Sequence, residues 1–153
     1  MIEAIFVASE KASPQIEVSE VALVAGKGIV GDRNFNRSKW LGQNITFIEA
    51  EEIEAFNAKY KRSLAIGETR RNIITRSVRL NDLVGKSFQI GGIQFYGVEL
   101  CEPCKKLGDL LATSDMQSRS VVHAWINKAG LRANVMTNGI LRVGMTFNDG
   151  PIA

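Results

Sequence analysis

The chain is poor in the residues that most often build metal and hydrolytic sites, since it has two cysteines and one histidine in 153 residues. Zinc needs more ligands than Cys101, Cys104 and His123 can supply without carboxylates. A serine-hydrolase triad would have to use His123, and the Gly-x-Ser-x-Gly elbow that usually presents the serine is missing. A zinc site and a serine hydrolase are therefore both disfavoured, and we expect His123 to be a packed or surface residue.

Long apolar runs and a strong charge of one sign are also lacking. No apolar run approaches the ~18 residues of a membrane-spanning helix, so no membrane association is expected. The net charge is +3, from 19 basic and 16 acidic residues, which is too weak to indicate nucleic-acid binding without a clustered face. The first residues carry an acid and no basic segment, so they predict a strand and not a signal peptide. Two cysteines without an export signal favour a reducing compartment, and we expect a cytoplasmic protein.

The rest of the composition is that of an ordinary globule, with 45% hydrophobic and 23% charged residues, and we expect a single domain over residues 1–153. Short β-type runs separated by glycine turns predict a mainly β fold, a barrel or a strongly bent sheet with peripheral helices. Hairpins are expected at Gly91-Gly92 and at Asn138-Gly139. The expected strands are 2–8, 18–24, 44–48, 72–75, 87–90, 93–100, 132–137, 140–143 and 145–148, and the expected helices are 49–60, 105–111 and 119–128.

The most concentrated chemistry lies at Cys101-Glu102-Pro103-Cys104, between the predicted strand 93–100 and the predicted helix 105–111. A thiol at such a junction lies near backbone N–H groups and the positive end of the helix dipole. Lys105 and Lys106 follow it directly. All three features favour the thiolate, which is both the nucleophile and the metal ligand.

Four interpretations of the cysteine pair stay open. It is a dithiol redox pair of the thioredoxin kind, half of a zinc site, one reactive thiol at Cys104 with Cys101 as its neighbour or resolving partner, or two buried structural cysteines. The 100 residues before Cys101 are far more than the short lead-in of a thioredoxin motif, which weakens the first interpretation.

Three other segments could bind an anion. In the loop 28–33 the glycines permit close backbone approach, Arg33 offers a planar fork of donors, and Asp32 could orient it. Arg70 and Arg71 precede the predicted strand 72–75, and Arg132 begins another strand. The simpler alternatives are a glycine turn with a surface ion pair and a solvated run of charge.

These segments follow one another in an order that resembles the MOSC domain, named for the C-terminal domain of eukaryotic molybdenum-cofactor sulfurase. No single piece is decisive, but the ordered set is specific, and it extends over about residues 1–149. The matching segments are Gly28-Ile-Val-Gly-Asp-Arg33, Arg70-Arg-Asn-Ile-Ile-Thr75, Leu83-Val-Gly-Lys-Ser-Phe-Gln-Ile-Gly91, Cys101-Glu-Pro-Cys-Lys-Lys-Leu107, Gly130-Leu-Arg-Ala-Asn-Val135 and Gly139-Ile-Leu-Arg-Val-Gly144.

The resemblance implies a β-barrel of the pyruvate-kinase type with peripheral helices. It also implies either molybdenum-cofactor (molybdopterin) binding, with Cys104 as the molybdenum ligand, or sulfur transfer through a persulfide on Cys104, with Cys101 secondary. The enzyme would then be a molybdenum-dependent reductase of N-hydroxylated substrates or a sulfur transferase. Its partner would be an electron-transfer protein or a pyridoxal-phosphate cysteine desulfurase. The residues matched to the cofactor pocket are Gly31, Asp32, Arg33, Arg70, Arg71, Asn72 and Arg132.

The alternatives from other classes are a cofactor-free dithiol redox module that uses Cys101 and Cys104, and a binding adaptor without chemistry. The sequence indicates no preference for an oligomeric state.

Overall fold

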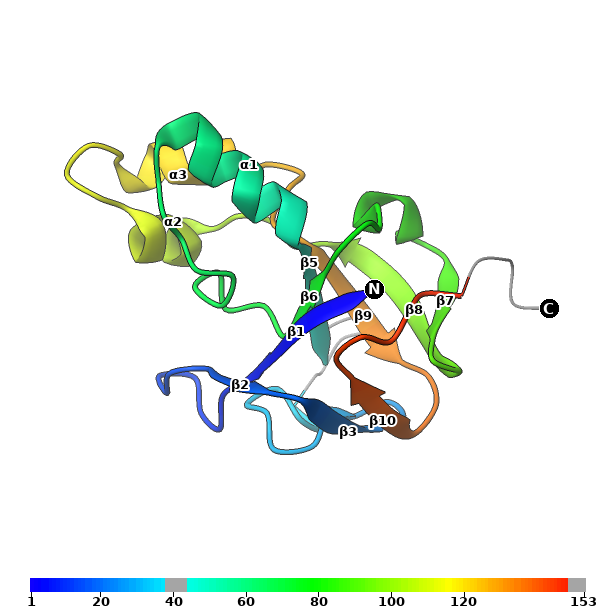
Figure 1. The fold of residues 1–153 in the computed structure, drawn as a ribbon. Helices are drawn as coiled ribbons and strands as arrows, with labels where there is room; N and C mark the ends of the chain where they lie inside the picture. The colour runs from blue at the N-terminus through cyan, green and yellow to red at the C-terminus, as the bar shows by residue number, and fades with distance from the viewer. Residues whose placement is uncertain (38–43, 149–153) are drawn as a thin grey trace.

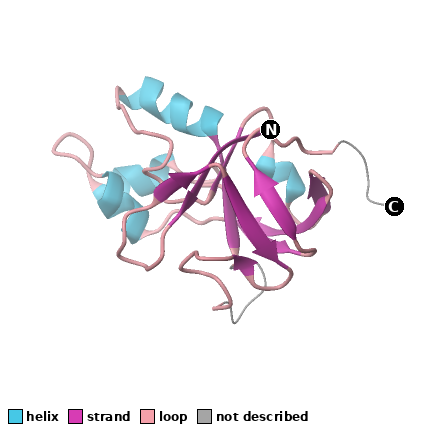
Figure 2. Ribbon diagram, turned by 60° about the horizontal axis from the view of Figure 1, so that its bottom comes forward, coloured by secondary structure: helices cyan, strands magenta, loops and turns pink. Residues whose placement is uncertain are grey.

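The computed structural model describes residues 1–37 and 44–148; residues 38–43 and 149–153, which belong to the predicted domain 1–153, lie outside the described residues. Strands dominate, and the α-helices gather on one side of them (Figures 1 and 2). The strands are β1 (Ile2–Val7), β2 (Ile16–Val18), β3 (Glu20–Val24), β4 (Gly28–Ile29), β5 (Ile45–Glu49), β6 (Ile73–Thr75), β7 (Ser87–Ile90), β8 (Ile93–Leu100), β9 (Leu131–Val135) and β10 (Gly139–Arg142). The helices are α1 (Ala50–Tyr60), α2 (Lys105–Leu111), α3 (Ser118–Ala124) and the 3₁₀ turn η1 (Leu80–Leu83).

Seven strands form a curled half-barrel sheet in the order β2-β1-β6-β5-β9-β8-β7, and a second sheet has the order β10-β3-β4. All pairs are antiparallel except β5 with β6. Only Ser19 separates β2 from β3, so the chain passes directly from one sheet into the other. This architecture confirms the mainly β, barrel-type fold with peripheral helices.

The central strands are buried on both faces, which explains their nearly continuous apolar sequences. Alternate residues of a strand point to opposite faces. Ile45 and Phe47 of β5 therefore pack in the core between the two sheets, together with Phe95. Ile48 packs in a second core under the helices, where the rings of Phe56 and Trp125 stack with centroids 5.0 Å apart.

The hairpin predicted at Asn138-Gly139 is wrong, although Gly91-Gly92 does join β7 to β8 as predicted. β9 pairs with β5 and β8, whereas β10 pairs with β3 in the other sheet. A two-residue hairpin of this composition needs positive φ at both central residues, and neither Asn138 nor Gly139 has it. Instead the Asn138 side chain accepts a hydrogen bond from the Ala25 N–H at 2.8 Å, which directs the chain toward β3.

Two predicted elements are shorter than expected. The helix predicted over 119–128 is α3, Ser118–Ala124, because the chain leaves helical geometry at Trp125 and buries that indole under α1. The strand predicted over 145–148 is reduced to one isolated bridge between Phe147 and Ile90. Among the described residues, no helix is long and apolar enough to cross a lipid bilayer.

Gly130 makes the closest backbone approach beside the cysteine segment, and its carbonyl accepts the Cys101 N–H at 2.8 Å. Its φ is +104°, and an added Cβ would lie 2.0 Å from the carbonyl oxygen of Phe47. Gly144 has a similar φ of +90°, but a Cβ added there would meet no atom within 4 Å. We expect Gly144→Ala to cost about 1–2 kcal/mol for backbone strain. Gly130→Ala should cost roughly 1–3 kcal/mol more, since it also overpacks.

Urea unfolding midpoints of the two variants and the wild type measure this difference. Equal losses of stability in both variants would show that the close approach between Gly130 and Phe47 adds nothing to the cost of the Gly130→Ala substitution.

Candidate functional site

The residues of interest gather on the helix-side face of the large sheet. Arg132 of β9 lies opposite Thr46 of β5 in the antiparallel register. Thr46 lies beside Asn72, which precedes β6, and the Phe6 N–H of β1 donates to the Asn72 carbonyl at 2.7 Å. Side chains of one row point to the same face. Strand pairing therefore brings together segments that are far apart in the sequence.

Asp32 anchors the glycine loop to this row. Its carboxylate is fully buried and accepts hydrogen bonds from the Ala8 N–H at 3.1 Å, the Asn34 N–H at 3.2 Å and the Asn72 side-chain amide at 3.3 Å. The Asn72 oxygen in turn accepts from the Thr46 hydroxyl at 3.1 Å. A buried carboxylate is tolerated only when it is well hydrogen-bonded, so these bonds position the loop that carries Arg33.

Arg33 is held in place at the centre of a positive cluster. Its side chain is 12% exposed, contacts Asp32 at 3.4 Å, and donates through Nη2 to the Arg70 carbonyl at 2.9 Å. Burial lowers the pKa of Arg33, Asp32 opposes this effect, and the nearby charges of Arg70 and Arg71 lower the pKa further. A guanidinium that is destabilised by burial and by like charges gains most from an incoming anion.

Arg70 and Arg71 diverge although they are adjacent. Arg70 adopts a left-handed φ of +60°, and its guanidinium donates to the carbonyls of Lys11 at 3.2 Å and Ser13 at 2.9 Å. Arg71 donates through Nε to the Ala129 carbonyl at 2.8 Å, on the side of β9. The turn of the backbone at Arg70 therefore sends the two charges in different directions.

The two cysteines differ in environment although only two residues separate them. Cys101 is 2% exposed in the core under the helices. Burial raises the pKa of its thiol, against the opposing charges of Arg71 and Arg132. The thiols of both residues are free.

Cys104 is exposed and occupies the N-cap position of α2. The backbone N–H groups of Leu107 and Lys106 face its sulfur and lower its pKa, with Leu107 the stronger influence and the partial burial of the thiol opposing both. The charges of Arg71 and Lys106 lower the pKa further. The charge of Arg71 thus acts on the pKa of Arg33 and of both cysteines, so the thiols and the positive cluster are linked electrostatically.

The site therefore contains most of the residues that the sequence singled out. Asp32, Arg33, Arg70 and Asn72 are joined by hydrogen bonds, and the charge of Arg71 acts on the pKa of both cysteines.

Gly31 and Arg132, which the sequence also singled out, contribute less to the candidate site. Gly31 has a φ of +86° and shapes the turn. Arg132 lies beside Cys101 but is more exposed and faces Glu99 at 3.9 Å.

Thr46 was not among the residues predicted from the sequence. A threonine in a strand carries no signal of function, and its role is visible only because its hydroxyl donates to the Asn72 side-chain oxygen in the structure. His123 is exposed on α3, as expected. In the described ranges, His, Cys, Asp and Glu side chains form no group of three that could hold a metal ion.

The half-barrel and its helix layer define a β-barrel-type domain. An exposed thiol and a cluster of arginines on this domain form its candidate site. The sequence model of the MOSC domain matches residues 31–148. The chain belongs to the MOSC domain family, which confirms the resemblance and is consistent with a domain associated with the molybdenum cofactor.

Solved structures share this fold. The YuaD protein from Bacillus subtilis superposes with a TM-score of 0.83 at 16% identity, over 95% of this chain and 92% of that chain. YiiM from Geobacillus stearothermophilus has a TM-score of 0.72 at 16% identity, with coverages of 96% and 74%. YiiM from Escherichia coli has a TM-score of 0.70 at 16% identity, with coverages of 96% and 68%. No curated protein matches the sequence. At these identities the structural likeness establishes the fold alone.

The contrast between the cysteines predicts selective alkylation. In native protein Cys104 should react with iodoacetamide much faster than Cys101, because it is exposed and its pKa is lowered whereas that of Cys101 is raised. The rate at Cys104 should rise with pH around a midpoint below the ~8.5 of an ordinary thiol. Peptide mass spectrometry at several pH values gives both rates, with urea-unfolded protein as the reference. Equal, slow labelling of both thiols in native protein would contradict the proposed site.

The electrostatic link through Arg71 can be tested separately. Arg71→Met should move the pH midpoint of Cys104 alkylation upward, since it removes a positive charge that stabilises the thiolate. Lys105→Met is the matched control, because Lys105 is highly exposed and pairs with Asp109, and its charge, unlike that of Lys106, is not among those that lower the pKa of Cys104, although its place in the sequence predicted that it would be. An equal shift in both variants would mean that general surface charge, and not Arg71, sets the pKa.

Proposed function

We propose that this MOSC protein binds the molybdenum cofactor, with Cys104 as its thiolate ligand and the arginine cluster as the site of the cofactor's phosphate. What supports this most directly is that Cys104 is exposed at the N-cap of α2, and that the charge of Arg71 acts on the pKa of this thiol and of Arg33 together. The same face of the protein would thus offer a soft sulfur donor and guanidinium groups that influence it electrostatically.

The residues fit the chemistry of this group. Soft thiolates are suitable ligands for transition metals, and guanidinium groups bind phosphate through paired, charge-assisted hydrogen bonds. Arg33 and Arg71 would hold the phosphate, and Asp32 and Asn72 would keep Arg33 in place. One metal ligand from the protein requires no cluster of His, Cys, Asp and Glu. When bound, the cofactor would supply two-electron redox chemistry.

The chain's own residues then have separate tasks. Cys104 presents its thiol at the surface, where the N–H groups of Leu107 and Lys106 lower its pKa and so favour the thiolate. Cys101 stays protonated in the core, because burial raises its pKa. Within this proposal the activity is reduction of an N-hydroxylated substrate, with an electron-transfer protein as the partner.

Sulfur transfer is the second candidate, and the same exposed thiolate favours it. The Cys104 thiolate would attack the outer sulfur of a persulfide on a pyridoxal-phosphate cysteine desulfurase. A new S–S bond forms at Cys104, the S–S bond of the donor breaks, and the donor cysteine leaves as a thiolate. The proton and electron counts balance without another reagent.

A dithiol redox module fits the structure less well. Such a module needs both sulfurs to reach each other and the partner, whereas Cys101 is 2% exposed and its pKa is raised. A binding adaptor without chemistry would have no need for the lowered pKa of Cys104. A single domain over residues 1–153, a cytoplasmic location and the absence of nucleic-acid binding remain predictions.

Co-expression in a host that makes molybdopterin tests the leading proposal. Purified wild type should contain molybdenum by elemental analysis and pterin by fluorescence of its oxidised form. Cys104→Ser should lose molybdenum, and Arg33→Met should lose pterin, each by roughly tenfold or more for a lost charged contact. Lys105→Met serves as the surface control.

The candidates give different outcomes. Persulfide on Cys104 by mass spectrometry, after incubation with a desulfurase and cysteine, supports sulfur transfer. Insulin reduction that disappears in both Cys101→Ser and Cys104→Ser supports the dithiol module. Absence of molybdenum and pterin from wild type, together with persulfide formation, would replace the first proposal by the second.

A further inference from the structure

The guanidinium of Arg70 has no task in the proposed function, where Arg33 and Arg71 hold the phosphate. It donates only through Nη2, to the carbonyls of Lys11 at 3.2 Å and Ser13 at 2.9 Å. Nε and Nη1 of Arg70 have no hydrogen-bond partner among the described residues, and no carboxylate there forms an ion pair with it. The charge is therefore held in place while two of its nitrogens stay free to donate.

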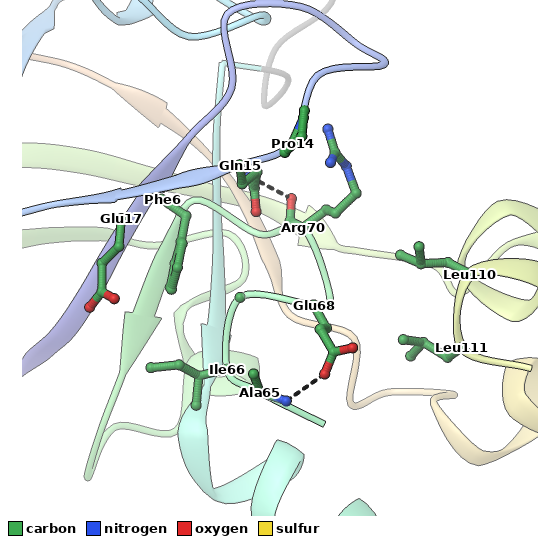
Figure 3. A pocket seen from close by; sticks show the side chains of 11 residues that line it. Phe6, Pro14, Gln15, Glu17, Ala65, Ile66, Glu68, Arg70, Leu110 and Leu111 are labelled. Carbon is green, nitrogen blue, oxygen red and sulfur yellow. Dashed lines mark hydrogen bonds between the residues drawn. The ribbon is translucent and has the colours of Figure 1, made fainter. Parts of the chain in front are cut away.

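A cavity of about 450 Å³ has this side chain in its lining. It is bounded by the segment 14–17 that leads into β2, the segment 65–70 and the end of α2 (Figure 3). Its volume lies within the ~300–1,000 Å³ of small-molecule sites. Cys104, Arg33 and Arg71 do not line it, so the cavity is separate from the proposed cofactor site.

The walls of this cavity are mostly apolar, with Phe6, Ile66, Leu110 and Leu111 in its lining. Close packing shapes one wall, since a Cβ added to Gly67 would lie 2.7 Å from Cε1 of the Phe6 ring. Leu110 is 51% exposed although it lies on the cavity wall. Covering such apolar surface with the body of a ligand is favourable, because it removes that surface from water.

The charges of the lining are unevenly placed. Arg70 is the one cation among the described residues that line the cavity, and Glu17 and Glu68 are the acids. In Figure 3 the Arg70 guanidinium points toward Pro14 and away from the Glu68 carboxylate, whereas Glu17 lies at the other side of the cavity. The carboxylate of Glu68 already accepts a hydrogen bond from the Ala65 N–H. The Pro14 end is therefore positive, and because the two acids would repel a multiply charged anion, it suits a single negative charge.

From these observations we propose that the cavity binds a small monocarboxylate with an apolar body. The carboxylate accepts a hydrogen bond from Nε or Nη1 of Arg70 at the Pro14 end, and such a charge-assisted bond is stronger than one between neutral groups. The apolar body lies against Phe6 and Leu110. This site works without the cofactor, because none of the residues proposed to contact the cofactor lines the cavity.

Phenylpropionate, phenylpropionamide and phenylpropylamine form a matched set of probes, since they share a ring and a chain of the same length and end in a negative, a neutral or a positive group. The isotope-labelled full chain is titrated with each, and NMR follows its backbone amides and its arginine Nε–H groups. Phenylpropionate should shift the Arg70 Nε–H and the amides of Gly67, Leu110 and Leu111 saturably. Phenylpropionamide should bind roughly tenfold more weakly, because it lacks the charge, and phenylpropylamine should leave these signals in place.

Two variants and a control test the assignment. Arg70→Met removes the charge and its donors and should weaken phenylpropionate binding by roughly tenfold or more. Leu110→Glu places a like charge at an exposed position of the cavity wall and should weaken binding by about fivefold. Ile126→Glu is the matched control, because Ile126 is 47% exposed and lies outside the lining. Because Arg70→Met also removes the bonds to Lys11 and Ser13, Leu110→Glu decides the question if Arg70→Met does not fold.

The proposal is overturned if phenylpropionate shifts none of these signals, if either of the other probes binds as tightly, or if Leu110→Glu and Ile126→Glu bind alike. It is also overturned if the shifts centre on Arg33 and Cys104, because the anion would then prefer the proposed cofactor site. The molybdenum and pterin contents of Leu110→Glu should equal those of the wild type, so the two proposals fail separately.

Discussion

The buried carboxylate of Asp32 is the constraint on which the candidate site depends. It joins the glycine loop to the end of β1 through Ala8 and to the start of β6 through Asn72. Arg33 is held between this carboxylate and the Arg70 carbonyl. Without that anchor the burial of Arg33 beside two other arginines would be unfavourable, because like charges in a partly desolvated place repel strongly. The cluster of Arg33, Arg70 and Arg71 can therefore form only because Asp32 attaches the glycine loop to the sheet.

The two-sided burial of the large sheet determines where chemistry can occur. One face is closed by the three-stranded sheet and filled by aromatic and aliphatic side chains. The other face is covered by helices over only part of its area, and the sequence segments before β6, after β8 and before β9 meet there. Cys101 lies under the helix layer and Cys104 at its edge. Burial raises the pKa of Cys101, whereas the backbone N–H groups of Leu107 and Lys106 at the start of α2 lower the pKa of Cys104.

Family membership and local geometry contribute different parts of the functional argument. The match to the MOSC domain over residues 31–148 establishes the family, whereas the solved neighbours at 16% identity establish only the shared fold. The role of Cys104 rests on its exposure and on the charges around it.

The sequence by itself determined the features that depend on neighbouring residues: the strand and helix on either side of the cysteine segment, the Gly91-Gly92 hairpin and the ordered motifs of the family. Only the tertiary structure decided that Cys101 is buried and Cys104 exposed, that Arg70 and Arg71 diverge, and that Asn138-Gly139 connects two sheets. The same holds for the hydrogen bond between Asn72 and Asp32, which are 40 residues apart. Local propensity acts over a few residues, whereas burial and strand pairing depend on segments that meet only in the folded chain.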